Sequence, residues 1–175
     1  MNTIKKLALI ALAMITFNAS AQTDKATTNK IIEEKNYIFV ATSAIPLSNM
    51  DVNRVLSGMP GANAGGVINL TGSNYDLRIV PDSVIAYLPF YGRAYRAPMN
   101  NDESGHKFTS KDFTYTKTKR KKGGWDVIIN TNDVKDNVRM NLNVTESGYG
   151  TLVVISNNKQ SITYNGYISE AKKSL

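Results

Sequence analysis

Short runs of alternating apolar and polar residues restrict the fold of this chain more than any other feature of its sequence. The most regular run spans residues 137–145, and its apolar members are Val138, Met140, Leu142 and Val144. Successive side chains of a β-strand point to opposite faces of a sheet, so this spacing predicts a strand with one buried face. Similar runs span residues 37–41, 67–70, 75–80, 83–88, 113–119, 125–131, 149–156 and 161–169.

Turn-forming residues separate these runs, which predicts hairpins between neighbouring strands. Pro81 and Asp82 mark one turn, and Gly123 and Gly124 mark another. The runs recur at intervals of about 8–12 residues and do not alternate with long helices. We therefore predict an all-β fold: a single antiparallel meander of about eight strands, closed or nearly closed into a lipocalin-like barrel. A two-sheet β-sandwich is the alternative.

The sequence before the strands divides into two parts. Residues 1–21 form a leader, and residues 22–36 form a polar segment with a short helix over 28–36, in which Ile31 and Ile32 face the core. The β domain then occupies residues 37–175. Two long loops, 48–66 with a helical turn at 52–56 and 92–111, fall inside this domain and indicate no further boundary.

The leader has the three parts of a secretory signal. Lys5 and Lys6 precede an apolar run over residues 7–17, and the small residues Ala19 and Ala21 follow it. Cleavage is therefore expected after Ala21. An uncleaved anchor is the alternative, although the run is shorter than the roughly 20 residues that a membrane-spanning helix needs.

Cysteine is absent from the chain, and a single histidine is present. The missing cysteine excludes disulfides, thiolate metal sites, a cysteine nucleophile and a lipid-modified amino terminus. An exported protein without disulfides is typical of the bacterial periplasm or cell envelope rather than of animal secretions.

The residues with the most distinctive binding chemistry follow the strand at 83–88. Tyrosine rings can stack on an apolar group, and arginine offers a planar fork for carboxylate or phosphate. The alternative is a structural corner in which these side chains brace the loop. Trp125 could extend the site or could anchor the core. The candidate ligand-binding residues are Tyr87, Tyr91, Arg93, Tyr95, Arg96 and Trp125.

A basic cluster precedes Gly123 and Gly124. It predicts contact with an anionic envelope surface, while the alternative is a solvated hairpin tip. Nucleic acid is a poor candidate partner for an exported protein. The cluster consists of Lys117, Lys119, Arg120, Lys121 and Lys122.

Catalytic, cofactor and metal motifs are absent from the sequence, which contains neither the hydrolase elbow nor the phosphate-binding glycine loop. We therefore predict no enzymatic activity, no cofactor and no metal, and we interpret His106 as a solvated loop residue. Ser83, in the sequence Asp-Ser-Val, is either an O-glycan acceptor or part of a turn.

Four segments of the chain are similar to a known family. They are residues 87–95 (YLPFYGRAY), 121–125 (KKGGW), 156–162 (SNNKQSI) and 164–168 (YNGYI). With the leader and short helix, they resemble domain-of-unknown-function family 4251, small exported proteins of Bacteroidetes-type bacteria. Pro81 stands where that family often has glycine, and the order Phe90-Tyr91 is reversed. The resemblance implies an envelope location and one β domain, and it supplies no catalytic residues.

These features together predict an exported, non-enzymatic protein that carries or senses a small amphipathic or anionic ligand. The alternative is an interaction or structural module of the envelope with a packed interior and no small-molecule ligand. Interior packing distinguishes the two: a cavity of roughly 300 Å³ or more inside the barrel, where the ligand would be held, would favour the carrier. The sequence leaves the oligomeric state open.

Overall fold

Strands account for most of the residues that the computed structural model describes, which are 23–47, 66–96 and 105–171. The predicted leader and the predicted helical turn at 52–56 lie outside these residues. The elements are α2 (Lys25–Glu33), β1 (Tyr37–Pro46), β2 (Ile68–Asn69), β3 (Asp76–Val80), β4 (Ser83–Leu88), β5 (His106–Ser110), β6 (Phe113–Lys119), β7 (Trp125–Thr131), β8 (Arg139–Val144), β9 (Tyr149–Ile155) and β10 (Ile162–Glu170).

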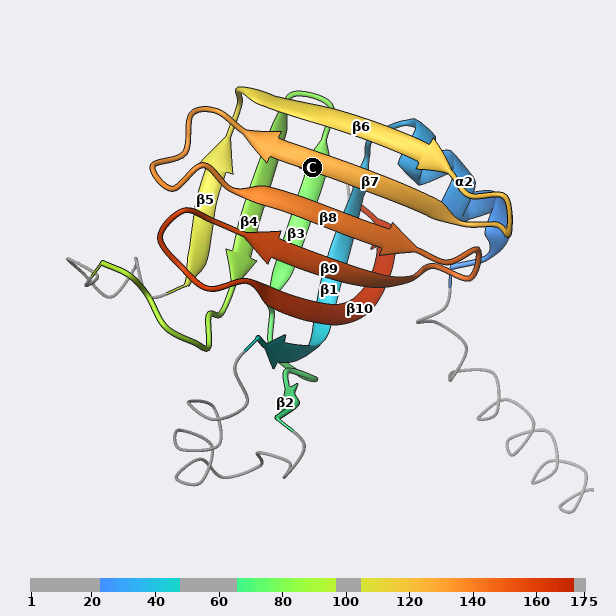
Figure 1. Cartoon of the computed structure of the whole chain (residues 1–175). Coiled ribbons are helices and arrows are strands. Elements are labelled where there is room, and N and C mark those ends of the chain that lie inside the picture. Colours follow the sequence, from blue (N-terminus) through green and yellow to red (C-terminus); the bar gives the residue numbers. More distant parts are fainter. Residues whose placement is uncertain (1–22, 48–65, 97–104, 172–175) are drawn as a thin grey trace, which may run out of the picture.

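The strands form one antiparallel sheet that curls into a nearly closed barrel. Their order is β5-β4-β3-β1-β10-β9-β8-β7-β6, with β2 paired beside β1. Strands β6 to β10 lie across β1, β3, β4 and β5, and β1 and β10 join the two layers (Figure 1). Apart from the short β2, which pairs with β1 alone, strands that follow one another in the chain are neighbours in the sheet except for β5 and β6, which are its two edges. The predicted up-and-down barrel is confirmed, with its opening at the β5–β6 seam.

Strand β5 corrects the prediction of one long loop over residues 92–111. Its inward positions at the two ends are His106 and Ser110, and both are buried although they are polar. Phe108 is the one apolar residue between them on this face, so the strand lacks the repeated apolar alternation on which the prediction depended.

Helix α2 begins and ends slightly earlier than the 28–36 predicted. The Asp24 side chain accepts hydrogen bonds from the backbone N–H groups of Ala26 and Thr27, at 2.8 and 2.9 Å, and thereby caps the helix start. Lys35 adopts a positive φ of 52° just after the last turn. Ile31 and Ile32 are buried as predicted.

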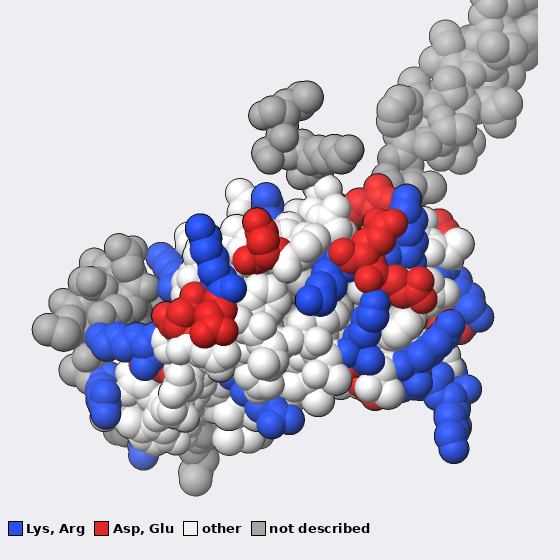
Figure 2. Space-filling view, turned by 90° about the horizontal axis from the view of Figure 1, so that it is seen from above, with Lys and Arg blue, Asp and Glu red and all other residues white. Residues whose placement is uncertain are grey.

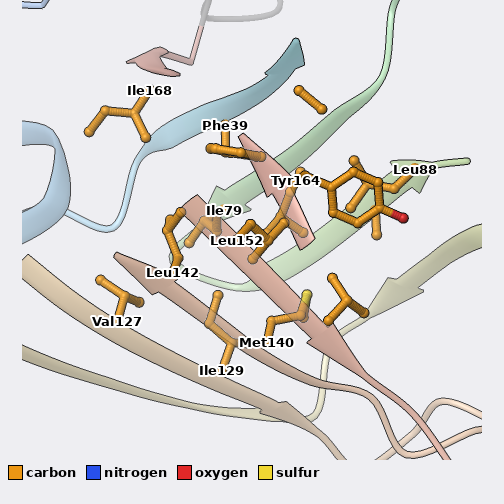
Figure 3. Close-up of a cluster of buried hydrophobic side chains, with 14 of the residues drawn as sticks. Phe39, Ile79, Leu88, Val127, Ile129, Met140, Leu142, Leu152, Tyr164 and Ile168 are labelled. Carbon is orange, nitrogen blue, oxygen red and sulfur yellow. The ribbon is translucent and has the colours of Figure 1, made fainter. Parts of the chain in front are cut away.

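Large apolar side chains from both layers fill the centre of the barrel (Figure 3). Val138, Met140, Leu142 and Val144 are all buried, which confirms the predicted inner face of the most regular run. Phe39, Leu77 and Ile79 meet them from the other layer. The barrel therefore has a packed interior.

A pair of glycines lets β1 and β10 approach closely. Gly150 and Gly166 lie opposite each other on β9 and β10. A Cβ atom on Gly166 would lie 1.9 Å from the carbonyl oxygen of Val40, and one on Gly150 would lie 3.0 Å from the Phe39 ring. Because glycine has no Cβ atom, the Phe39 ring can pack directly over Gly150 and Gly166.

Helix α2 covers one end of the barrel, at the right in Figure 1. The indole N–H of Trp125 donates to Asn29 Oδ1 at 2.8 Å, and Lys117 Nζ donates to the Glu33 carbonyl oxygen at 2.8 Å. The hydroxyls of Tyr37 on β1 and Tyr115 on β6 lie 3.1 Å apart. These contacts close the end at which β6 has separated from β5. None of the described helices has the length and apolar character needed to cross a membrane.

Replacing Leu142 with alanine tests the assignment of the core. Leu142 is 1% exposed, so Leu142→Ala should lower the free energy of unfolding by about 2–5 kcal/mol. Leu47 is 71% exposed, so Leu47→Ala should change the free energy of unfolding by less than about 0.5 kcal/mol. Urea unfolding of both variants measures the difference. Equal losses in the two variants would contradict the packing described here.

Candidate functional site: a cavity at the loop end of the barrel

A cavity of about 560 Å³ lies at the end of the barrel opposite α2, which we call the loop end. Its walls come from β5, from the β7–β8 and β9–β10 connections, and from the segment 90–96 that follows β4. This volume lies within the range of about 300–1,000 Å³ that is typical of small-molecule sites. Because the barrel centre is packed, the cavity lies beside the core rather than inside it.

The lining of the cavity combines apolar and charged side chains. Phe90, Phe108, Val134 and Val138 form its apolar part. Arg96, Lys107, Lys135 and Lys159 contribute positive charge, and Asp133 and Asp136 contribute negative charge. Among the lining residues that the structure describes, the cations outnumber the acids, so their formal charge is positive when His106 is neutral.

Backbone pairing between two distant segments builds one wall of the cavity. Ala94 forms a β-bridge with Lys159. The N–H of Tyr95 donates to the Asn158 carbonyl oxygen at 2.8 Å, and the N–H of Gln160 donates to the Arg93 carbonyl oxygen at 3.1 Å. These bonds hold Lys159, in the β9–β10 connection, against the chain that leaves β4.

Lys159 places a cation in a buried position. Only 7% of the surface of this residue is exposed. Its Nζ donates a hydrogen bond to the Gly105 carbonyl oxygen at 2.6 Å. The same Nζ lies 5.8 Å from the centroid of the Phe90 ring. Burial of an ammonium group is costly without hydrogen-bond acceptors, so the Gly105 contact helps to hold the charge in place.

His106 lies beside Lys159 and is buried, with 3% of its surface exposed. Its ring meets the Phe90 ring edge to face, with centroids 5.6 Å apart. Burial, followed by the positive charge of Lys159, lowers the pKa of His106 to about 3. The imidazole is therefore neutral at neutral pH, and its Nε2 has no hydrogen-bond partner among the described residues. The interpretation of His106 as a solvated loop residue is wrong, because β5 carries its side chain inward.

Asp133 fastens the β7–β8 connection to the turn between β5 and β6. Its carboxylate accepts hydrogen bonds from Ser110 Oγ at 2.5 Å and from the N–H groups of Lys111 and Asp112 at 2.8 and 3.1 Å. The Ser110 bond, followed by the Lys111 bond, lowers the pKa of Asp133 to about 2. The Asp133 carboxylate is thus engaged by the turn between β5 and β6.

Most of the chain matches the model of one protein family. The family model for "Domain of unknown function (DUF4251)" matches residues 19–168. The chain belongs to this family. The resemblance predicted from four short segments is therefore confirmed.

The fold has a solved counterpart within DUF4251. A crystal structure of a DUF4251 family protein from Bacteroides eggerthii matches with a TM-score of 0.56 and 10% sequence identity. The match covers 86% of this chain and 89% of that chain. At this identity the likeness shows a shared fold and nothing finer. No curated protein matches the chain.

In this DUF4251 chain, Arg96 is the member of the predicted ligand-binding set that lines the cavity. Tyr91 packs half-buried against the core, and burial raises its pKa. Arg93 and Tyr95 are exposed, and their backbones pair with the β9–β10 connection.

The other two predicted residues lie elsewhere. Tyr87 points outward from β4, where it stacks on Tyr75 at 5.5 Å and lies under Lys107. Trp125 packs under α2, at the opposite end of the barrel. The predicted set is therefore divided among the cavity rim, the outer face of β4 and the α2 end.

The sequence analysis missed the two buried polar residues of the cavity, Lys159 and His106. Lys159 falls in the family segment 156–162, but nothing in its local sequence distinguishes it from surface lysines. Only the pairing with residue 94 carries it inward.

Three of the five residues in the basic cluster have structural contacts. Lys117 bonds to the end of α2, Lys119 lies over the Trp125 ring at 5.5 Å, and Arg120 donates to the Val144 carbonyl oxygen at 2.8 Å. Lys121 and Lys122 are exposed at the tip. Acidic and basic side chains are interspersed at the α2 end, at the right in Figure 2. Contact with an anionic surface stays a prediction that depends on these two lysines.

Ser83 begins β4, immediately after the Pro81-Asp82 turn, and its hydroxyl donates to Asp82 Oδ1 at 3.1 Å. This position agrees with the turn that the sequence predicts. Its role as an O-glycan acceptor stays a prediction.

The buried His106 should make stability depend on pH. Its pKa is about 3 in the folded chain and 6.5 in a solvated histidine, so between these values the unfolded chain binds the additional proton. Stability should therefore fall as the pH falls below 6.5, by up to about 1.4 kcal/mol per pH unit. His106 is the single histidine of the chain, and His106→Phe should remove this slope. Urea unfolding from pH 7 to about pH 5 measures it. Identical slopes in the two proteins would contradict a neutral, buried His106.

Proposed function

We propose that the protein is an exported, non-enzymatic binding protein that carries or senses a small amphipathic anion in the cavity at the loop end. The observation that carries this proposal is one cavity of about 560 Å³ that joins an apolar wall to an excess of cationic side chains. Ligand pockets typically have this make-up: a mostly apolar surface with a few placed polar groups.

Charge supports an anionic ligand over a cationic one. Four lysine or arginine residues line the cavity against two aspartates, and Asp133 already accepts three hydrogen bonds from the β5–β6 turn. The formal charge of the described lining residues is thus positive. A cleft lined by one sign of charge attracts ligands of the other sign.

Packing supports a site at the rim rather than a ligand enclosed in the barrel. Phe39, Leu142 and their neighbours fill the centre of the barrel. The cavity therefore lies at the loop end and outside this core. In this respect the proposed carrier differs from the lipocalin-like arrangement that the sequence suggested. The packed interior also fits the alternative, a structural module, but that alternative does not account for the cavity.

Native mass spectrometry of the protein purified from its own envelope tests the proposal. We expect a noncovalent small molecule on the wild type, and its loss from Val134→Trp, because Val134 lines the cavity and a tryptophan would fill it. The control is Thr116→Trp, an equally large insertion at an exposed position of β6. Wild type that stays free of ligand, even after incubation with an extract of envelope lipids and metabolites, would contradict the proposal.

Export is a separate part of the proposal and has its own test. The tripartite leader supports cleavage after Ala21. The intact mass of the protein from the periplasmic or envelope fraction should correspond to a chain that begins at Gln22. Recovery of the full chain with Met1 in the membrane fraction would instead favour the uncleaved anchor.

A further inference from the structure

We propose that the outer face of β8, β9 and β10 is a binding surface for a neutral polysaccharide. These strands belong to the front layer in Figure 1, and the alternate side chains that leave the core point toward the viewer. None of these residues lines the cavity, so the site goes beyond the proposed function. We call it the amide–tyrosine face, and its residues are Asn141, Asn143, Tyr149, Thr151, Val153, Thr163, Asn165 and Tyr167.

Strand pairing places these side chains in rows that cross the sheet. Asn143, Thr151 and Asn165 are partners on adjacent strands and form one row. Tyr149 and Tyr167 are partners in the next row. Neighbouring strands lie about 4.7–4.9 Å apart, a spacing comparable with the length of one pyranose unit. A linear polysaccharide that lies across the strands can therefore present one sugar to each strand.

The amide–tyrosine face has no charged member, although the chain has a formal net charge of +7. The exposed surface of a soluble domain is ordinarily rich in lysine, arginine, aspartate and glutamate. Its charged neighbours on β7 and β8, Asp126 and Arg139, have opposite signs, and Asp126 already pairs with Arg120 at 3.5 Å. A surface without net charge complements a partner without charge.

Amides, hydroxyls and tyrosine rings are the groups that complement a sugar. A sugar hydroxyl both donates and accepts hydrogen bonds, and so does a side-chain amide. Asn143 is exposed, and its side chain forms no hydrogen bond with the described residues. Asn165 Oδ1 accepts a hydrogen bond from Thr151 Oγ1 at 3.1 Å, which orients the Asn165 amide within the row. Tyr149 is 53% exposed, so its ring can stack on the apolar C–H face of a sugar.

A protein partner, including a second copy of this chain, matches the face less well. The buried cores of protein interfaces are more apolar than the rest of the surface, whereas Val153 is the single aliphatic residue of this face. A dry interface would also remove the three asparagine amides from water, and each would then need a hydrogen-bond partner. A hydrated polyhydroxyl chain supplies such partners.

Sedimentation with insoluble neutral polysaccharides tests the proposal. The probes are cellulose, curdlan and β-mannan in about 0.5 M NaCl, which screens the attraction of a basic chain for charged material. Wild type should sediment with at least one of them. Tyr149→Ala should weaken that binding by about 10-fold because it removes the stacking ring. Asn143→Leu should weaken it by about 5-fold because it replaces the amide with an apolar side chain of similar size.

Tyr95→Ala is the matched control. Tyr95 is 65% exposed, and its backbone pairs with the β9–β10 connection at the loop end, outside the amide–tyrosine face and outside the cavity lining. This variant should bind as the wild type does. Circular dichroism checks the fold of each variant. If one face variant fails to fold, the other variant and displacement of wild type by soluble oligosaccharides of the same polysaccharide decide the question.

Three results would overturn the proposal. The first is wild type that sediments with none of the three polysaccharides, or only when the NaCl is removed. The second is equal binding by wild type and both face variants. The third is a wild-type dimer in analytical ultracentrifugation that Tyr149→Ala converts to a monomer, because a second copy would then cover the face. None of these results bears on the cavity, whose ligand native mass spectrometry tests separately.

Discussion

The pairing of β1 with β10 is the constraint on which the rest of the structure depends. It joins the first strand of the barrel to the last, from Tyr37 opposite Glu170 to Pro46 opposite Ile162. Without it, strands β1 to β5 and strands β6 to β10 would be two separate sheets. The close approach needs Gly166, where any side chain would collide with the Val40 carbonyl. The ring of Phe39 then covers the glycines and links this pairing to the core.

Closure through β1 and β10 determines where the barrel is open. Strands β5 and β6 are joined only by residues 111–112, but they are the two edges of the sheet and do not pair with each other. Helix α2, with Tyr37 and Tyr115, covers the end of the barrel at which β6 no longer lies beside β5. At the other end β5 meets the β7–β8 and β9–β10 connections, and the cavity lies between them. The proposed site is thus a consequence of the way in which the sheet closes.

Much of the fold is predictable from local patterns because alternation and turn chemistry act over a few residues. The run 137–145 has one apolar face that becomes core, and Ile31 and Ile32 face inward from a short helix. Strand β5 could not be found in this way. Its inner positions His106 and Ser110 are polar, since one lies at the cavity and the other bonds to Asp133. A polar inner face resembles a loop when only the sequence is considered.

The class of the fold, the up-and-down order of the strands and the family could all be predicted from the amino-acid sequence, because they depend on periodic patterns and contiguous segments. It also singled out the arginine and tyrosine residues after β4, of which Arg96 lines the cavity. The folded structure was needed to show that Arg96 lines the cavity, that Trp125 lies at the far end, and that Lys159 and His106 both lie beside Phe90. Residues 90, 106 and 159 come from three distant segments. Their meeting depends on barrel closure and on the pairing of residues 94 and 159, which no local pattern encodes.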